Sequence, residues 1–151
     1  MKANVTVAPI GADDLEEALP LFAGYQRFYE AEPDDARNLA FFRRFVAPSE
    51  DGILFGAWLD GRLVGFACTY WTFSSTHAAE AGLMNDLFVA EGTRGAGIGR
   101  ALIEAAAAAA RDKGMRHLEW FTAVDNLRAQ RLYDSMEAEK SAWYAYEILL
   151  E

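Results

Sequence analysis

A short apolar strand that runs into a glycine-rich turn and then into a helix is the feature that most constrains this chain. The strand reads LMNDLFV over residues 83–89, and the turn reads RGAGIGR over residues 94–100. Because glycine has no side chain, backbone N–H groups in such a turn can close around an anion at the positive end of the helix. Arg94 and Arg100 add positive charge. The pattern therefore predicts a site for a pyrophosphate group.

Two other phosphate-binding turns have a different spacing. A P-loop requires G-x-x-x-x-G-K-[ST], and no lysine follows the glycines here. A dinucleotide fingerprint requires G-x-G-x-x-G in a first βαβ unit, whereas this chain has G-x-G-x-G late in its sequence. The glycines alone also leave open a helix that begins with glycines and binds nothing.

A second pattern lies downstream of the glycines. Residues 126–133 read NLRAQRLY, so that Asn126 and Tyr133 are about two helical turns apart and share one helix face. Together the two patterns resemble the GNAT N-acetyltransferase superfamily, over residues 53–151. The resemblance implies that acetyl-coenzyme A is the cosubstrate and that the glycine turn holds its pyrophosphate. The coenzyme-binding residues that it implies are Leu87, Phe88, Val89, Arg94, Gly95, Ala96, Gly97, Ile98, Gly99, Arg100, Asn126 and Ala129.

The resemblance also implies a reaction, the direct transfer of acetyl to a primary amine in a ternary complex. Backbone N–H groups of Leu87–Val89 would polarise the carbonyl, and Tyr133 would protonate the departing thiolate. The chain looks most like the diamine and polyamine (spermidine/spermine-like) acetyltransferases. Two alternatives remain: a non-catalytic acyl-CoA-binding regulatory module and a nucleotide-binding domain.

The chain departs from the polyamine enzymes at the general base, a Glu for which this chain has Asn85. Strict strand alternation points the neighbouring Asp86 to the opposite face. Glu80, Glu30, Glu32 and a chain of water molecules are further possibilities, and the sequence assigns no base. Cys68, the only cysteine, is expected in the core and is not required for direct transfer.

The expected fold is α/β, a mixed, mostly antiparallel sheet flanked by helices in one domain over residues 1–151. Its predicted order is β-α-α-β-β-β-α-β-α-β(-β). Strands are expected at residues 4–10, 53–59, 63–73, 82–89, 117–122 and 143–150, with Asp60-Gly61 as a hairpin turn. Helices are expected after Asp13, after Asp34 or Asp35, from Ile98 and at residues 126–135. Pro20 predicts a kink or break in the first of these helices.

The 151 residues carry a net charge of −9. This acidity argues against nucleic-acid and anionic-membrane surfaces, which require basic patches, and favours a cationic acceptor. Glu30, Glu32 and Asp35 are candidate acceptor-binding residues. Aromatic neighbours are expected to pack an alkyl chain between these charges: Phe28, Tyr29, Phe41 and Phe42. One cysteine and two distant histidines predict no metal site. We further expect a homodimer.

No apolar run reaches the roughly 18 residues that a membrane span needs. Pro9, Gly11 and Asp13 interrupt the first apolar stretch before a signal-peptide core forms. The sequence therefore predicts a cytoplasmic protein.

Overall fold

The computed structural model describes residues 4–93 and 95–151. The chain falls into two units, Met1–Phe121 and Thr122–Glu151. The first unit is a sheet with helices on both faces, and the second holds one helix and a segment without assigned helix or strand. The prediction of a single domain stays a prediction.

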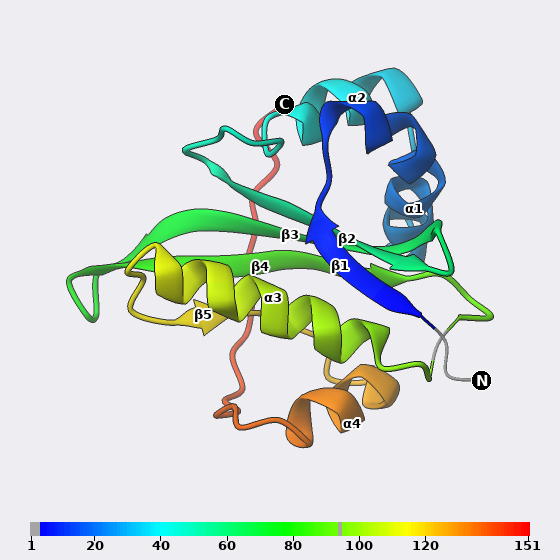
Figure 1. Cartoon of the computed structure of the whole chain (residues 1–151). Coiled ribbons are helices and arrows are strands. Elements are labelled where there is room, and N and C mark those ends of the chain that lie inside the picture. Colours follow the sequence, from blue (N-terminus) through cyan, green and yellow to red (C-terminus); the bar gives the residue numbers. More distant parts are fainter. Residues whose placement is uncertain (1–3, 94) are drawn as a thin grey trace. The chain divides into compact units, whose positions relative to one another are not determined.

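The sheet of the first unit follows the chain from one edge to the other (Figure 1). Neighbouring strands are antiparallel except the last pair, in which β5 runs parallel to β4. The strands are β1 (Val5–Pro9), β2 (Gly52–Leu59), β3 (Arg62–Ser74), β4 (Ala79–Val89) and β5 (Leu118–Glu119). The mixed, mostly antiparallel α/β fold predicted from the sequence is confirmed.

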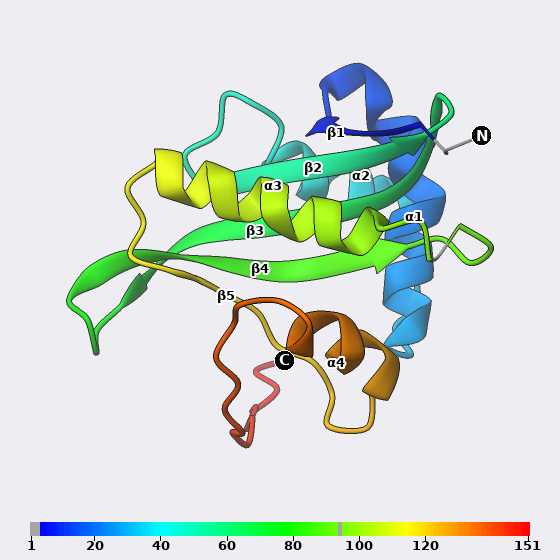
Figure 2. The same ribbon diagram turned by 60° about the horizontal axis from the view of Figure 1, so that its bottom comes forward.

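Helices cover both faces of this sheet. The helices α1 (Leu15–Phe28) and α2 (Asp35–Arg43) lie on one face, and α3 (Ile98–Asp112) lies on the other (Figures 1 and 2). On the first face Phe22 of α1 stacks on Phe42 of α2 with ring centroids 3.8 Å apart, and both rings meet the edge or face of Phe66 on β3. These rings bury much apolar area and form the centre of the core.

Two polar contacts hold α1 in place. The side-chain amides of Gln26 and Asn38 hydrogen-bond reciprocally, at 2.8 and 2.9 Å, and Asn38 is buried. The Glu17 carboxylate accepts a hydrogen bond from the backbone N–H of Leu63 at 3.1 Å. Because buried polar groups are costly when unpaired, these contacts favour one placement of α1 against α2 and the sheet.

Several local signals are confirmed. Asp60 and Gly61 have φ values of 50° and 85°, the double positive φ of a type I′ hairpin turn. Asp34 accepts a hydrogen bond from the backbone N–H of Arg37 and so caps α2. Of the two outcomes expected at Pro20, the break is absent, because α1 continues through this residue, and the kink stays a prediction.

The second unit contains α4 (Leu127–Asp134), capped by Asn126. The predicted strand over residues 143–150 is wrong, because this segment has no strand assignment and its large apolar side chains are exposed. Apolar and aromatic residues become a strand only where another strand pairs with them. Residues 143–146 and 148–150 are consecutive apolar residues, without the alternation that gives a strand one buried face.

No helix in the described part of the chain is both long and apolar enough to cross a membrane. Likewise, the described residues contain no group of three His, Cys, Asp or Glu side chains able to hold a metal ion.

Candidate functional site

The glycine turn between β4 and α3 has the backbone conformation that its sequence predicts. Gly95 and Gly97 have φ values of 91° and 77°, a region that residues with a side chain rarely adopt. A Cβ atom built on either glycine meets no described atom within 4 Å. The turn therefore leaves open space next to its backbone, where an anionic group fits.

The turn leads into the positive end of α3. Gly97 is the N-cap, and its carbonyl accepts the first helical hydrogen bond, from the N–H of Ala101 at 3.0 Å. The first turn of the helix carries no acidic residue, so no carboxylate of the helix itself offsets the positive end of the helix dipole. Ala96, Ile98 and Gly99 complete the turn. Ile98 is buried and anchors the helix start in the core.

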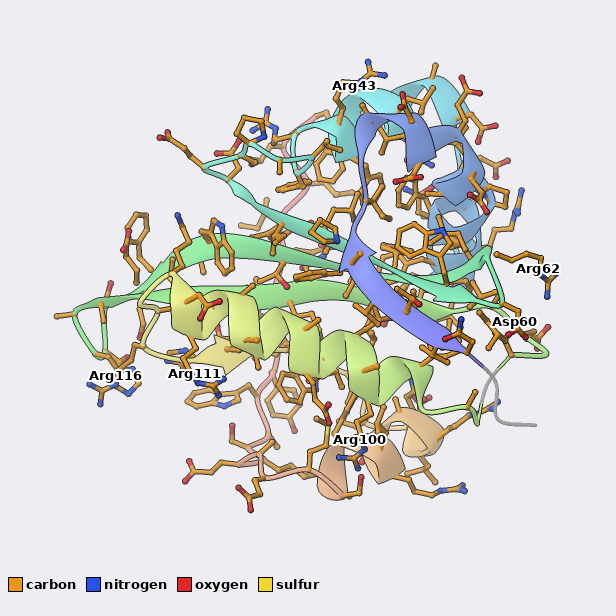
Figure 3. The ribbon with its side chains drawn as sticks, viewed as in Figure 1. Arg43, Asp60, Arg62, Arg100, Arg111 and Arg116 are labelled. Atoms are coloured by element: carbon orange, nitrogen blue, oxygen red, sulfur yellow. The ribbon has the colours of Figure 1, made fainter. Side chains whose placement is uncertain are left out.

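The two arginines of the turn differ in what the structure describes. Arg94 lies outside the described residues. The Arg100 side chain leaves the N-terminal end of α3, whereas Arg111 lies near the opposite end of the helix (Figure 3). Arg100 thus places a cation at the same end as the glycine turn.

The strand before the turn has an open edge on one side. Strand β5 pairs with β4 only at Gly82 and Leu83. Beyond that point, within the described residues, β4 has β3 on one side and no strand on the other. Leu87, Phe88 and Val89, half-buried, lie in this part of β4 and lead directly toward the glycine turn. An extended ligand arm that follows the turn would meet their backbone.

A β-bulge interrupts the same strand at Asn85. Cys68 pairs with Asp86, but the next residue of β3, Thr69, pairs with Met84, so Asn85 is the extra residue. Bulges change the direction of side chains next to them. Here the Asn85 amide donates a hydrogen bond of 2.6 Å to the Asp86 carboxylate. Strict alternation, from which we expected the two side chains on opposite faces, therefore fails at this position.

Asp86 is a buried carboxyl, with 2% of its surface exposed. It shares the α1–α2 face of the sheet with Phe66 and Cys68. Burial raises the pKa of Asp86 to about 6, although hydrogen bonds from Asn85 and Tyr25 act to lower it. No basic side chain contributes to this shift among the described residues. A buried carboxylate without a cation is unusual, and such a group is a candidate functional residue.

Tyr25 reaches this carboxyl from α1. The helix lies close to β4, because a Cβ on Gly24 would come within 2.8 Å of the Phe88 ring. The Tyr25 hydroxyl lies 3.1 Å from the Asn85 carbonyl oxygen and also interacts with the Asp86 side chain, so its one proton can be donated to either acceptor. Burial, followed by the charge of Asp86, raises the pKa of Tyr25, so its hydroxyl stays protonated.

Cys68 lies opposite Asp86 on β3 and is fully buried. Burial and the Asp86 charge raise the pKa of its thiol well above the usual range. A thiol in this state is a poor nucleophile, because the thiolate is the reactive form. The expected core position of Cys68 is confirmed.

The second motif lies in the other unit. The Asn126 side chain accepts a hydrogen bond from the backbone N–H of Ala129 at 3.2 Å, which makes Asn126 the N-cap of α4. Asn126, Ala129 and Tyr133 recur at spacings of three and four residues, so they share one face of this helix. Tyr133 is half-buried and lies in the last turn.

The acidic candidates lie around the loop between α1 and α2. Glu30, Glu32 and Asp35 are exposed, and Asp35 lies in the first turn of α2. Phe28, Tyr29 and Phe41 are exposed nearby in the sequence, but Phe42, which we expected to line an acceptor site, is a core residue.

Comparison with known proteins points in one direction. The sequence model described as the acetyltransferase (GNAT) family matches residues 15–137. An uncharacterized N-acetyltransferase of Bacillus subtilis (strain 168) is 32% identical over 136 residues, covering 90% of this chain and 91% of that protein. A D-amino-acid N-acetyltransferase of Saccharomyces cerevisiae is 34% identical over 134 residues, covering 86% of this chain and 82% of that protein.

Solved structures agree with this. The crystal structure of a ribosomal-protein-alanine N-acetyltransferase from Brucella melitensis biovar Abortus 2308 has a TM-score of 0.78 at 26% identity, covering 98% of this chain and all of that one. An aminoglycoside N-acetyltransferase in complex with CoA shares the fold, with a TM-score of 0.80 at 19% identity over 98% of both chains. The family's sequence model spans most of this chain, and the two relatives, each more than 30% identical, align with it over most of both lengths. This chain therefore belongs to the GNAT family of acetyltransferases.

Proposed function

We propose that this protein transfers acetyl from acetyl-CoA to a primary amine, directly and in a ternary complex. One observation carries the proposal: left-handed glycines at the positive end of α3 leave open space next to their backbone, directly after the part of β4 to which no described strand pairs on the β5 side. Acetyl-CoA is the acyl donor that the GNAT family uses, and its pyrophosphate and pantetheine arm match these two features. The family's sequence model spans both units, which supports their acting as one domain.

The candidate site residues have the following roles in the proposed reaction. The N–H groups of the glycine turn would bind the pyrophosphate, and the backbone of Leu87–Val89 would hold the pantetheine arm and polarise the acetyl carbonyl. Asn126 and Ala129, at the start of α4, would line the pantetheine arm. Tyr133 would give its proton to the sulfur that leaves. The protonated, buried Cys68 supports transfer without an acyl-cysteine.

The proposal is tested with the purified chain, acetyl-CoA and a panel of amines. The panel contains diamines, polyamines, a lysine peptide, an aminoglycoside and, because of the yeast relative's name, D-amino acids. We expect thiol release that depends on one amine class, with the acetylated amine identified by mass spectrometry. Coenzyme binding without release on any of these amines would instead support a non-catalytic acyl-CoA-binding module. Preference for NAD or ATP over coenzyme A would support a nucleotide-binding domain.

We expect Gly97→Val to lower the affinity for coenzyme A at least tenfold, about 1.4 kcal/mol. A β-branched residue is strained at a φ of 77°, and its side chain enters the open space of the turn. Calorimetry with coenzyme A measures the change, and circular dichroism checks that the fold is retained. Gly61→Val, in the distant hairpin turn, is the matched control, since its φ of 85° brings similar strain without a ligand. Equal affinities for the two variants would refute the pyrophosphate site.

For the acceptor we propose a cation, recognised in part by the acidic residues Glu30, Glu32 and Asp35. Attraction between charges weakens as salt screens it. We therefore expect kcat/KM for a diamine or polyamine to fall as ionic strength rises. Glu32→Gln with Asp35→Asn should raise KM for a polyamine more than for a monoamine.

The matched control is Glu104→Gln with Asp112→Asn, two exposed acids of α3 on the other face of the sheet. This pair removes the same total charge and should leave the ratio of polyamine to monoamine KM unchanged. A flat salt dependence, with both double variants behaving alike, would refute the cationic-acceptor proposal. The homodimer, the cytoplasmic location and the absence of a nucleic-acid or membrane partner remain predictions from the sequence.

A further inference from the structure

Asp86 is the one buried carboxyl among the described residues, and the sequence assigned it no role. It lies on β4 one residue before Leu87, so it is adjacent to the backbone that would hold the acetyl group. An ionised carboxylate in the core destabilises a protein unless a cation or several hydrogen bonds compensate. Asn85 and Tyr25 supply hydrogen bonds, and none of the basic side chains that the structure describes supplies the cation. The ionised form of Asp86 therefore has only hydrogen bonds to compensate its charge within the described residues.

The acceptor cannot touch Asp86 directly in this structure, because the carboxyl is only 2% exposed. The half-buried Tyr25 contacts both this carboxyl and, through its hydroxyl, the backbone carbonyl of the exposed Asn85. A phenol has one proton and two acceptor lone pairs. When Asp86 is ionised, Tyr25 donates to it. When Asp86 is protonated, it can donate to the Tyr25 oxygen while Tyr25 donates to Asn85.

We propose that Asp86 takes up the proton that the acceptor ammonium loses, and that the Tyr25 hydroxyl passes this proton on. The proposal rests on the amine acetylation proposed above and supplies the base that the sequence left unassigned. It places the base on Asp86, which the bulge at Asn85 turns toward Tyr25, rather than on Asn85 itself.

The proton balance is simple. The Tyr25 oxygen takes a proton from R–NH3⁺ as the Tyr25 proton moves to the Asp86 carboxylate, which leaves R–NH2, neutral tyrosine and Asp86 as the acid. The amine nitrogen then bonds to the acetyl carbon, the carbon–sulfur bond breaks with its electron pair on sulfur, nitrogen loses a second proton and sulfur gains one. Asp86 returns its proton to solvent by the same route. The sum is R–NH3⁺ plus the thioester giving the amide, the thiol and H⁺.

The ionisation of both groups suits this route. With a pKa of about 6, Asp86 is mostly ionised at neutral pH and still basic enough to hold a proton. The raised pKa of Tyr25 prevents a stable tyrosinate, so its two proton transfers occur together.

The test compares Asp86→Asn and Tyr25→Phe with the wild type, using the best amine of the panel. The wild-type kcat should fall below a pH of about 6, where Asp86 becomes protonated. In Asp86→Asn, kcat should fall about 10²-fold or more, since general acid–base catalysis contributes typically 10²–10⁴-fold. The decrease of kcat at low pH, the acidic limb of the pH profile, should also disappear. Tyr25→Phe should lower kcat about tenfold or more and move the limb to higher pH, because the hydrogen bond that lowers the Asp86 pKa is gone.

Tyr70→Phe is the matched control. Tyr70 lies on the same face of the sheet, and the charge of Asp86 contributes to its raised pKa, but its ring stacks on Phe45 and no hydrogen bond to Asp86 contributes to its shift. Its kcat and acidic limb should stay within about twofold of the wild type. Carbon-13 NMR of the carboxyl groups gives a readout without turnover: one Asp should titrate near pH 6 in the wild type and higher in Tyr25→Phe, while calorimetry finds unchanged coenzyme affinity in all variants.

The outcomes separate the two proposals. If the wild type acetylates no amine, the proposed function fails and this inference fails with it. If the wild type is active and Asp86→Asn keeps its rate and acidic limb, Asp86 is not the proton acceptor and only the inference fails. If Asp86→Asn is inactive but Tyr25→Phe behaves like Tyr70→Phe, the relay through Tyr25 is refuted.

Discussion

Replacing Tyr133 by Phe should lower kcat by about 10² or more and leave the affinity for acetyl-CoA nearly unchanged. The phenyl ring keeps the shape of the side chain and removes only the proton that the departing thiolate needs. The proposal for Tyr133 rests on its place on α4, on the same face as Asn126 and Ala129. The rate at saturating acetyl-CoA and amine gives kcat, and calorimetry gives the coenzyme affinity.

The control for this variant is Tyr144→Phe, in the exposed segment after α4, which should have the wild-type rate. A second acyl donor sharpens the test. A thioester of a more acidic thiol releases a thiolate that needs no proton, so the loss of kcat in Tyr133→Phe should be smaller with that donor. A kcat for Tyr133→Phe within about twofold of the wild type would mean that the thiolate receives its proton from another group.

Much of the fold was predictable because its signals are local. Asp60-Gly61 adopts a turn that few other residue pairs allow, and Asp34 and Asn126 cap the helices that follow them. The glycine turn before α3 belongs to the same class, since the positive φ of Gly95 and Gly97 is what a glycine pattern can indicate. For these residues the conformation depends on the residue and its immediate neighbours.

The errors of prediction depend on distant contacts instead. Pro20 costs about 3 kcal/mol in an isolated helix, yet α1 continues because the next residues, Leu21 and Phe22, are buried against the sheet. Residues 143–150 have strand-forming side chains but no strand beside them. In both cases the tertiary environment outweighs the local preference.

The same reasoning explains why the sequence left the base unassigned, although Asp86 is nearest to the position of the missing Glu. The direction of the Asp86 side chain depends on the bulge at Asn85, which exists only in the pairing of β4 with β3. Strict alternation along the sequence contains no information on that pairing. One signal was available: an acidic residue within the apolar strand LMNDLFV is itself unusual, because Asp is seldom buried without a partner.

Asp86→Asn should make the protein more stable at neutral pH while it lowers the activity. Burial raises the Asp86 pKa from 3.8 to about 6. Well below pH 3.8 the carboxyl is protonated in both the folded and the unfolded chain. As the pH rises, the unfolded chain ionises first, so between these pKa values the folded chain holds more protons and the wild-type free energy of unfolding falls. Above pH 6 the full loss is about 3 kcal/mol, at about 1.36 kcal/mol for each pH unit between the two pKa values.

The Asn variant carries no charge, so it should escape this loss. Urea unfolding at several pH values should find it more stable than the wild type above pH 6 by up to about 3 kcal/mol, with the difference disappearing well below pH 3.8. Asp112→Asn, an exposed control, should change the unfolding free energy by less than about 0.5 kcal/mol at every pH. A wild type as stable as Asp86→Asn above pH 6 would mean that the carboxylate is compensated in the folded chain. Higher stability together with lost activity would instead identify a charge that the fold keeps at a cost because the reaction needs it.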